Sequence, residues 1–307
     1  MAWIIAGIVF GVLVLTICIL SIIAYKIVFY SPLKGQNSEY NNLKNVDYQA
    51  ISGKVSNFLN QILSVPATDL YAFSYDGLKL HAYFYKSEGS KEFVILFHGY
   101  RRTARRSFCG LAMDLLKQNK NVILVDQRAH GLSEGHQTTF GKKEQYDVVT
   151  WVNFVKNYFG KDSVITVGGV SLGASSVLFA ADKIDENVKI VSDSPFINMK
   201  QTFIKVIHGY KMPVWFFYPI AVLTAAVFCH MSLKCDAAIT VNKSKNKILL
   251  IHCGLDKIVP NSVSEKLHFD NRDHVQYANF EGVEHGFTYL RQTEKYRKVF
   301  FDFLNQK

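Results

Sequence analysis

A serine framed by glycines follows an apolar run near the middle of the chain. Residues 164–174 read VITVGGVSLGA, which places Gly169 two positions before Ser171 and Gly173 two positions after it. Small residues at these positions permit the sharp strand-to-helix turn of a nucleophile elbow, which lifts a serine hydroxyl above a sheet at the positive end of a helix. The pattern predicts that Ser171 acts as a nucleophile.

A serine hydroxyl needs a base to take its proton and an acid to orient that base. His285 follows the last apolar run of the predicted sheet, and Asp256 follows the run before it. Both positions correspond to carboxyl ends of strands, where open α/β sheets bind their ligands. The chain order predicts a triad of Ser171, Asp256 and His285. Asp193 stays open as a displaced acid, whereas Asp126 precedes the nucleophile and breaks the order.

The residues His98, Gly99 and Tyr100 end another apolar run. We expect the backbone N–H groups of Tyr100 and Leu172 to form an oxyanion hole there, and His98 to be structural. Four arginines follow within six residues: Arg101, Arg102, Arg105 and Arg106. They could bind an anionic head group, a phosphate or a carboxylate, and we expect Arg101 to contact substrate. The alternative, which is equally supported, is that they are solvated at the start of a helix.

A polar segment reading DQRAHG occupies residues 126–131, after an apolar run. We interpret it as a cluster that fixes a loop, in which Asp126 pairs with Arg128 and Gly131 forms a tight turn. We assign it no chemistry.

The sequence shows no spacing typical of metal or nucleotide binding. It has no HExxH, paired-cysteine or EF-hand pattern and no GxGxxG or Walker loop, and its five cysteines are scattered. We therefore expect neither a metal nor a cofactor.

Short apolar runs alternate with helical patterns along residues 67–307. A hairpin with an Asp-Gly turn is predicted at 70–85. It is followed by strands at 93–97, 122–125, 164–167, 190–191, 248–251 and 275–280 and by helices at 106–117, 144–158, 174–184 and 289–304. This order predicts an α/β domain with a mostly parallel sheet.

An insertion at about 196–245 interrupts this alternation. Residues 212–231 are almost uniformly apolar and aromatic, and Trp215 is a candidate substrate contact. A membrane span there would separate Ser171 from its partners, and Pro213 and Pro219 disfavour one unbroken helix. We expect helices of a cap over a pocket, in preference to a surface that dips into the bilayer.

The first 30 residues form a candidate membrane anchor. Residues 2–25 carry no charge and are long enough to cross a bilayer as a helix, and neither a basic start nor a small-residue cleavage site suggests a cleaved signal. A polar connector with a short helix at 55–63 is predicted at 31–66. Lys26, Lys34 and Lys44 favour a cytoplasmic position for the following domain.

The composition permits a large buried core. The chain has 307 residues, of which 49% are hydrophobic and 20% charged, so disorder is excluded for most of it. The formal net charge of +10 comes from dispersed basic residues, which indicate a solvated surface. We expect no nucleic-acid partner.

At these residues the chain resembles the α/β-hydrolase superfamily, and more narrowly the membrane-anchored bacterial serine hydrolases related to the Bem46 and prolyl oligopeptidase-like group. The resemblance covers about 71–304 and rests on HGY at 98–100, DQRAHG at 126–131, GVSLGA at 169–174 and GxDxxVP at 254–260. It implies an eight-stranded, mostly parallel sheet, a cap after the sixth strand and a triad that needs no cofactor. Because the family includes carboxylesterases, lysophospholipases, thioesterases and peptidases, the fold does not identify the substrate.

Together these features predict a single-pass, membrane-anchored serine hydrolase that cleaves carboxylic esters, including those of lipids or lysophospholipids, through an acyl-enzyme. A prolyl oligopeptidase-like peptidase and a catalytically silent binding protein with the same fold are the alternatives.

Overall fold

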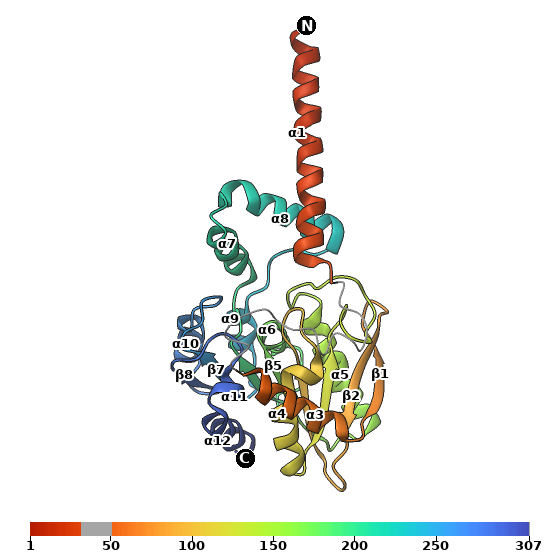
Figure 1. Ribbon diagram of the computed structural model, residues 1–307, viewed down its shortest axis with the longest axis vertical. Helices are drawn as coiled ribbons and strands as arrows, with labels where there is room; N and C mark the ends of the chain where they lie inside the picture. The colour runs from red at the N-terminus through yellow and green to blue at the C-terminus, as the bar shows by residue number, and fades with distance from the viewer. Residues whose placement is uncertain (32–50, 307) are drawn as a thin grey trace.

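The computed structural model describes residues 1–31 and 51–306, and its centre is one eight-stranded sheet covered by helices on both faces (Figure 1). The predicted α/β fold class is confirmed. The strands are β1 (Thr68–Phe73), β2 (Lys79–Tyr85), β3 (Glu92–Phe97), β4 (Asn121–Asp126), β5 (Val164–Val170), β6 (Lys189–Asp193), β7 (Ile248–Cys253) and β8 (Val275–Phe280).

The sheet has the order β1-β2-β4-β3-β5-β6-β7-β8. Strand β2 pairs antiparallel with β1 and β4, and the other neighbours are parallel. In register, Phe97 lies opposite Gly169, and Val170 lies opposite Asp193. The carboxyl ends of the parallel strands therefore meet at one edge, where the predicted site residues follow them.

Two apolar cores fill the space between the sheet and its helices. The first contains buried residues of α5 (Glu144–Tyr158), α6 (Leu172–Phe179), α9 (Ala237–Lys243) and α10 (Ser262–Asp270). The second contains residues of α3 (Ser52–Ser64), α4 (Ala104–Lys117) and α12 (Thr293–Leu304), and the short α11 (Thr288–Arg291) precedes α12. Strands β4 and β7 are buried throughout, and β3 and β5 are buried after their first residue, apart from the half-buried last residue of β5, as expected for a sheet covered on both faces.

Helix α3 lies in the segment for which the sequence predicts a connector. Its residues Val55, Leu59 and Ile62 are buried in the second core, and α3 packs against α4. This amphipathic stripe joins the helix to the folded domain. The rest of the predicted connector, residues 32–50, lies outside the described residues.

The chain begins with α1 (Ala2–Ala24), which continues as a π-helical turn, η1 (Tyr25–Phe29). Together they form the one described helix that is long and apolar enough to cross a membrane, and most of it stands away from the rest of the molecule (Figure 1). The turn η1 packs into a third apolar cluster, where Phe29 stacks on Phe203 and meets the edge of Phe140.

The predicted cap segment, at about 196–245, forms α7 (Met199–Gly209), α8 (Val214–Cys229) and α9, between β6 and β7. The expectation that Pro213 and Pro219 disfavour one unbroken helix is wrong for Pro219, because α8 runs through it, whereas Pro213 lies at the boundary where α8 begins. A proline there removes one helical hydrogen bond, to the carbonyl of Trp215, while packing holds the helix. Residues Ile220 and Thr224 are buried, and α8 contacts α1 and α7.

Candidate active site

The turn between β5 and α6 holds Ser171 in a conformation that is rare for a residue with a side chain. Its φ of 55° and ψ of −113° lie outside the usual allowed regions, which is a form of backbone strain found at functional sites. The Ser171 N–H donates to the carbonyl of Asp193 across 2.8 Å, which ties the turn to β6.

The two glycines of the GVSLG motif explain how the turn fits. A Cβ at Gly169 would overlap the backbone of Gly173, and a Cβ at Gly173 would overlap the carbonyl of Phe97 at the end of β3. Only glycine allows α6 to start this close to β3 and β5.

Ser171, His285 and Asp256 lie in one hydrogen-bonded row, although they come from three separate loops. The Ser171 hydroxyl lies 2.8 Å from His285 Nε2, and His285 Nδ1 lies 2.6 Å from Asp256 Oδ2. If Nδ1 carries the proton and donates it to the carboxylate, Nε2 is free to accept the serine proton. The side chain of Asp256 is fully buried, whereas that of His285 is 15% exposed.

The carboxylate of Asp256 is held on both oxygens. Its Oδ1 accepts the backbone N–H groups of Ile258 and Val259, at 2.9 and 2.8 Å. Burial by itself would raise the pKa of Asp256, but the hydrogen bonds from His252 and His285 outweigh it and lower that pKa well below its usual range. The acid is therefore ionised at neutral pH.

A second histidine, His252, contacts the carboxylate of Asp256 and was not predicted as a site residue. It is fully buried on β7, with Nε2 3.3 Å from Asp256 Oδ2 and 3.1 Å from the carbonyl of Val259. Because both neighbours are acceptors, Nε2 must carry a proton, and Nδ1 can accept from the Ser264 hydroxyl at 2.7 Å. The only signal in the sequence is a histidine within an otherwise apolar strand.

Asp193, the alternative acid, faces other partners. Its buried carboxylate accepts the hydroxyls of Thr288 and Ser194. Burial raises the pKa of Asp193, in contrast to that of Asp256. His285 Nδ1 therefore contacts Asp256 and not Asp193. Asp193 instead holds the turn at Ser171, because its backbone carbonyl accepts the Ser171 N–H.

The loop after β3 passes beside the serine. A Cβ at Gly99 would lie 3.5 Å from the Ser171 Cβ, so Tyr100 follows at the edge of the site, and Leu172 opens α6 on the other side of Ser171. The first N–H groups of a helix have no intrahelical acceptor. The loop at Gly99 and the start of α6 therefore both lie beside Ser171, which keeps the backbone N–H groups of Tyr100 and Leu172 as the candidates for an oxyanion hole.

Two neutral histidines hold this loop in place. Burial, aided by His130, lowers the pKa of His98 to about 3, and its Nε2 accepts the N–H of Gln127 at 3.1 Å. His130 accepts the N–H of Arg101 at 3.2 Å, and burial lowers its pKa too. His98 Nδ1 donates to the carbonyl of Gly99, and His130 Nδ1 donates to the carbonyl of Arg128. Both histidines therefore stabilise the conformation of the loop.

The side chains of Tyr100 and Arg101 bind the foot of the N-terminal helix. The Tyr100 hydroxyl donates to the carbonyl of Val28 at 2.7 Å. Arg101 Nη2 donates to the carbonyls of Ile27 and Tyr30, at 2.7 and 3.0 Å. The arginine for which we predicted a substrate contact therefore uses Nη2 to bind the chain's own backbone, whereas its buried Nε has no hydrogen-bond partner among the described residues.

Comparisons with known proteins agree with this architecture. The family described as alpha/beta hydrolase fold matches residues 92–217. The esterase Pf2001 of Pyrococcus furiosus superimposes with a TM-score of 0.65 at 26% identity, over 80% of this chain and 94% of the esterase. This chain has the α/β-hydrolase fold.

Two further proteins share parts of the likeness. The Bacillus subtilis (strain 168) protein YqkD, which is uncharacterized, is 26% identical over 240 residues, 76% of this chain and 77% of YqkD. A puromycin-hydrolyzing peptidase of Mycobacterium tuberculosis has a TM-score of 0.56 at 16% identity, over 77% of this chain and 39% of the peptidase, and shows a similarity of fold alone.

The DQRAHG loop of this α/β-hydrolase fold forms different pairs from those expected. Arg128 binds Asp147 and Asp76, with Nη–Oδ distances of 2.6 and 2.9 Å, and not Asp126. The carboxylate of Asp126 contacts His81 Nδ1 at 2.8 Å instead. The cluster does fix a loop, as predicted. It does so by joining the first hairpin to α5, because the two carboxylates that bind the buried guanidinium, Asp76 and Asp147, both lie outside the motif.

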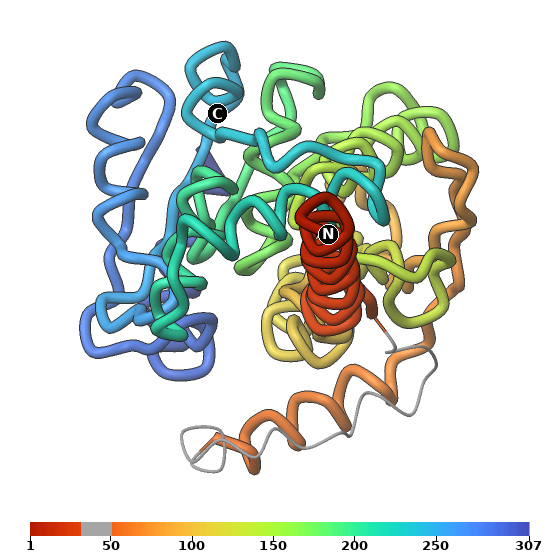
Figure 2. Tube along the Cα trace, turned by 90° about the horizontal axis from the view of Figure 1, so that it is seen from above, coloured from red at the N-terminus to blue at the C-terminus, as the bar shows by residue number. Residues whose placement is uncertain are grey.

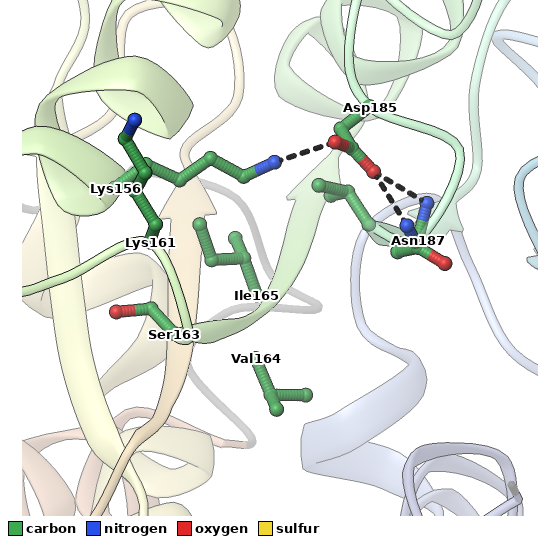
Figure 3. Close-up of a pocket in the computed structure, with 8 residues that line it drawn as sticks. Lys156, Lys161, Ser163, Val164, Ile165, Asp185 and Asn187 are labelled. Carbon is green, nitrogen blue, oxygen red and sulfur yellow. Dashed lines mark hydrogen bonds and ion pairs between the residues drawn. The ribbon is translucent and has the colours of Figure 1, made fainter.

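Trp215, the other predicted substrate contact, is 79% exposed on α8. A cavity of about 180 Å³ lies elsewhere, at the start of β5 and beside Asp185, which is paired with Lys156 at 2.8 Å (Figure 3). Ser171 follows the other end of β5, so this cavity is separate from the triad. No group of three or more metal-ligating side chains occurs in the described part of the chain.

Proposed function

We propose that this protein is a membrane-anchored serine hydrolase that cleaves carboxylic esters through an acyl-enzyme on Ser171. The observation that carries the proposal is the continuous row from the Ser171 hydroxyl through His285 to Asp256, with heavy-atom distances of 2.8 and 2.6 Å. These distances lie within the range required between a nucleophile, its base and the group that orients the base.

In the first half of the reaction, Ser171 Oγ attacks the ester carbonyl while His285 Nε2 takes its proton. The negative charge passes to the carbonyl oxygen, which the N–H groups of Tyr100 and Leu172 stabilise. When the bond to the leaving alcohol breaks, the imidazolium returns the proton to that alcohol. Asp256 remains ionised and stabilises the imidazolium.

In the second half, water replaces the alcohol. His285 takes a proton from water as it attacks the acyl-enzyme, and the second tetrahedral intermediate expels Ser171 Oγ, which regains its proton. The products are a carboxylic acid and free enzyme. Apart from the ester and this water, each step uses only side chains and backbone groups of the site.

The esterase reading draws support from the structural likeness to the Pyrococcus furiosus esterase. The proposal of a membrane anchor draws support from α1 and η1, which contain an 18-residue window with a mean hydropathy of 2.8 of which only 6% is buried. The lysines at and after the carboxyl end of this helix favour a cytoplasmic hydrolase domain: Lys26 in its last turn, and Lys34 and Lys44 beyond it.

The test compares the wild type with Ser171→Ala on p-nitrophenyl esters of increasing acyl length, and pairs each assay with labelling by a fluorophosphonate. We expect turnover and labelling in the wild type and loss of both in the variant, whose circular dichroism stays unchanged. Labelling without ester turnover would favour the peptidase. Absence of both would favour the catalytically silent binding protein.

A further inference from the structure

Helix α8 presents an apolar stripe to the outside of the molecule. Trp215 is 79% exposed, Leu223 43% and Val227 54%, and Pro219, Val222 and Ala226 are exposed beside them. These positions recur at the three- and four-residue spacing of one helical face. The sixteen residues of α8 include no charged side chain, so this face has nothing that water would solvate well.

The opposite face of α8 packs against the foot of the N-terminal helix. Thr224 Oγ1 lies 3.4 Å from the carbonyl of Ser21, and the ring of Phe228 stacks on that of Tyr25 at 5.0 Å. Figures 1 and 2 show α8 running across the foot of α1, whereas the rest of α1 extends away from the domain. If α1 stands upright in a bilayer, α8 lies along its surface.

The length of α1 that precedes this contact matches the thickness of the hydrocarbon core of a bilayer. Residues 2–20 of α1, which precede the contacts at Ser21 and Tyr25, extend about 28 Å at 1.5 Å per residue. The hydrocarbon core of a bilayer is about 30 Å thick. Helix α8 therefore meets α1 where the acyl chains give way to the head groups, which is also the depth at which tryptophan side chains concentrate.

The charges around α8 suit an anionic surface. Residues 194–235, which hold α7 and α8, contain no aspartate or glutamate. Their charged residues are four exposed lysines: Lys200, Lys205, Lys211 and Lys234. Basic residues beside an apolar helical face are typical of helices that lie in the interface of membranes containing anionic lipids.

We infer that α8 is a second membrane contact, with its exposed face embedded at the boundary between acyl chains and anionic head groups. This inference rests on the membrane span proposed for α1. It also narrows the proposed substrate class to acyl esters held in the bilayer. The cluster under α8 contains Phe29 and Phe140, and Phe140 stacks on Tyr100 in the loop beside Ser171, so aromatic contacts connect the underside of α8 to the edge of the site.

Fluorescence quenching tests the depth of Trp215. The chain has three tryptophans, and Trp151 is fully buried in the domain core. The Trp3→Phe protein is reconstituted into vesicles of phosphatidylcholine and phosphatidylglycerol, with and without acyl-chain bromination. The signal of Trp215 is the difference from the Trp3→Phe/Trp215→Phe protein. We expect it to be blue-shifted, quenched by brominated lipid and protected from iodide.

Other outcomes would overturn the inference. Quenching by iodide but not by brominated lipid would show that the face is in water, and quenching by neither would show that protein covers it. The Trp215→Phe protein reports on Trp3 in the same vesicles. If Trp3 is not quenched by brominated lipid, the proposed membrane span itself has failed, which separates the two hypotheses.

An activity assay links the face to the substrate. We expect Leu223→Glu/Val227→Glu to lose hydrolysis of a phospholipid ester in vesicles while keeping that of a soluble short-chain ester. The matched control, Tyr158→Glu/Phe269→Glu, changes two exposed aromatic residues outside α8 and should keep both activities. Equal loss of both substrates, or loss of neither, in the α8 variant would contradict the inferred role. Inactivity of the wild type on both would count against the proposed hydrolase function.

Discussion

The phenol of Tyr100 donates a hydrogen bond to the carbonyl oxygen of Val28 across 2.7 Å. Tyr100 also supplies one of the two proposed oxyanion donors through its backbone. The same residue thus joins the foot of the N-terminal helix to the proposed catalytic site, with Arg101 adding two more hydrogen bonds beside it.

We predict that Tyr100→Phe lowers kcat/KM by about fivefold, because losing one neutral hydrogen bond costs about 1 kcal/mol and loosens the loop that carries the N–H group. Steady-state kinetics on a soluble ester measure the effect. Tyr158→Phe, which removes the hydroxyl of a 69% exposed tyrosine, is the control. An unchanged rate for Tyr100→Phe would show that the loop keeps its position without the bond.

Replacing the acid tests the orientation of His285. In Asp256→Asn the amide can donate to Nδ1, which moves the imidazole proton to Nε2 and blocks acceptance from Ser171. We expect kcat to fall by roughly 10⁴-fold, as in other triads. Asp162→Asn, at an exposed carboxylate paired with Lys91, should keep full activity. A comparable activity in Asp256→Asn and the wild type would remove Asp256 from the proposed mechanism.

The buried His98 makes stability depend on pH. Its pKa is lowered to about 3 by burial, so between pH 6.5 and 3 the unfolded chain binds more protons than the native protein, and stability falls as the pH falls. We expect His98 to lower the free energy of unfolding by about 2 kcal/mol when the pH falls from 7 to 5.

The measurement is the free energy of unfolding of the wild type and of His98→Asn at both pH values. The variant should be less stable at pH 7, because it loses part of the packing in the loop, but the gap should narrow at pH 5. A gap that stays constant would mean that His98 is not held neutral.

Gly173 should tolerate no side chain. A Cβ there would overlap the carbonyl oxygens of Phe97 and His98, both of which are backbone atoms that cannot move aside. We predict that Gly173→Ala lowers the melting temperature sharply or prevents folding.

Gly53 provides the matched control for this substitution. It lies in α3, and a Cβ at this position would meet no other atom within 4 Å. Gly53→Ala should therefore raise the free energy of unfolding by up to about 1 kcal/mol. Similar melting temperatures for the two alanine variants would contradict the steric argument.

The sequence predicted the fold because its signals are local. The apolar run that becomes β5, the glycines around Ser171 and the Asp-Gly turn at Gly77 each depend on a few neighbouring residues, and the predicted fold class is confirmed. The three proposed triad residues could be chosen in the same way, because each follows a strand and the chain order is restrictive.

Features that depend on distant contacts were not predictable. Nothing around Arg128 indicates that its partners are Asp76 and Asp147, and a backbone carbonyl such as that of Val28 has no signature in the sequence. The position of α8 was open for the same reason. An apolar helix can cover a pocket or face outward, and only its packing on Ser21 and Tyr25 shows which face is left exposed.

The close approach of Gly173 to Phe97 also limits how the site can move. Because α6 rests directly on the end of β3, the amide of Leu172 has a fixed position relative to the sheet. The amide of Tyr100 belongs to a loop that is held from below by His98 and His130 and from above by the foot of the N-terminal helix. The distance between the two proposed donors therefore depends on contacts made by the N-terminal helix as well as on the domain core.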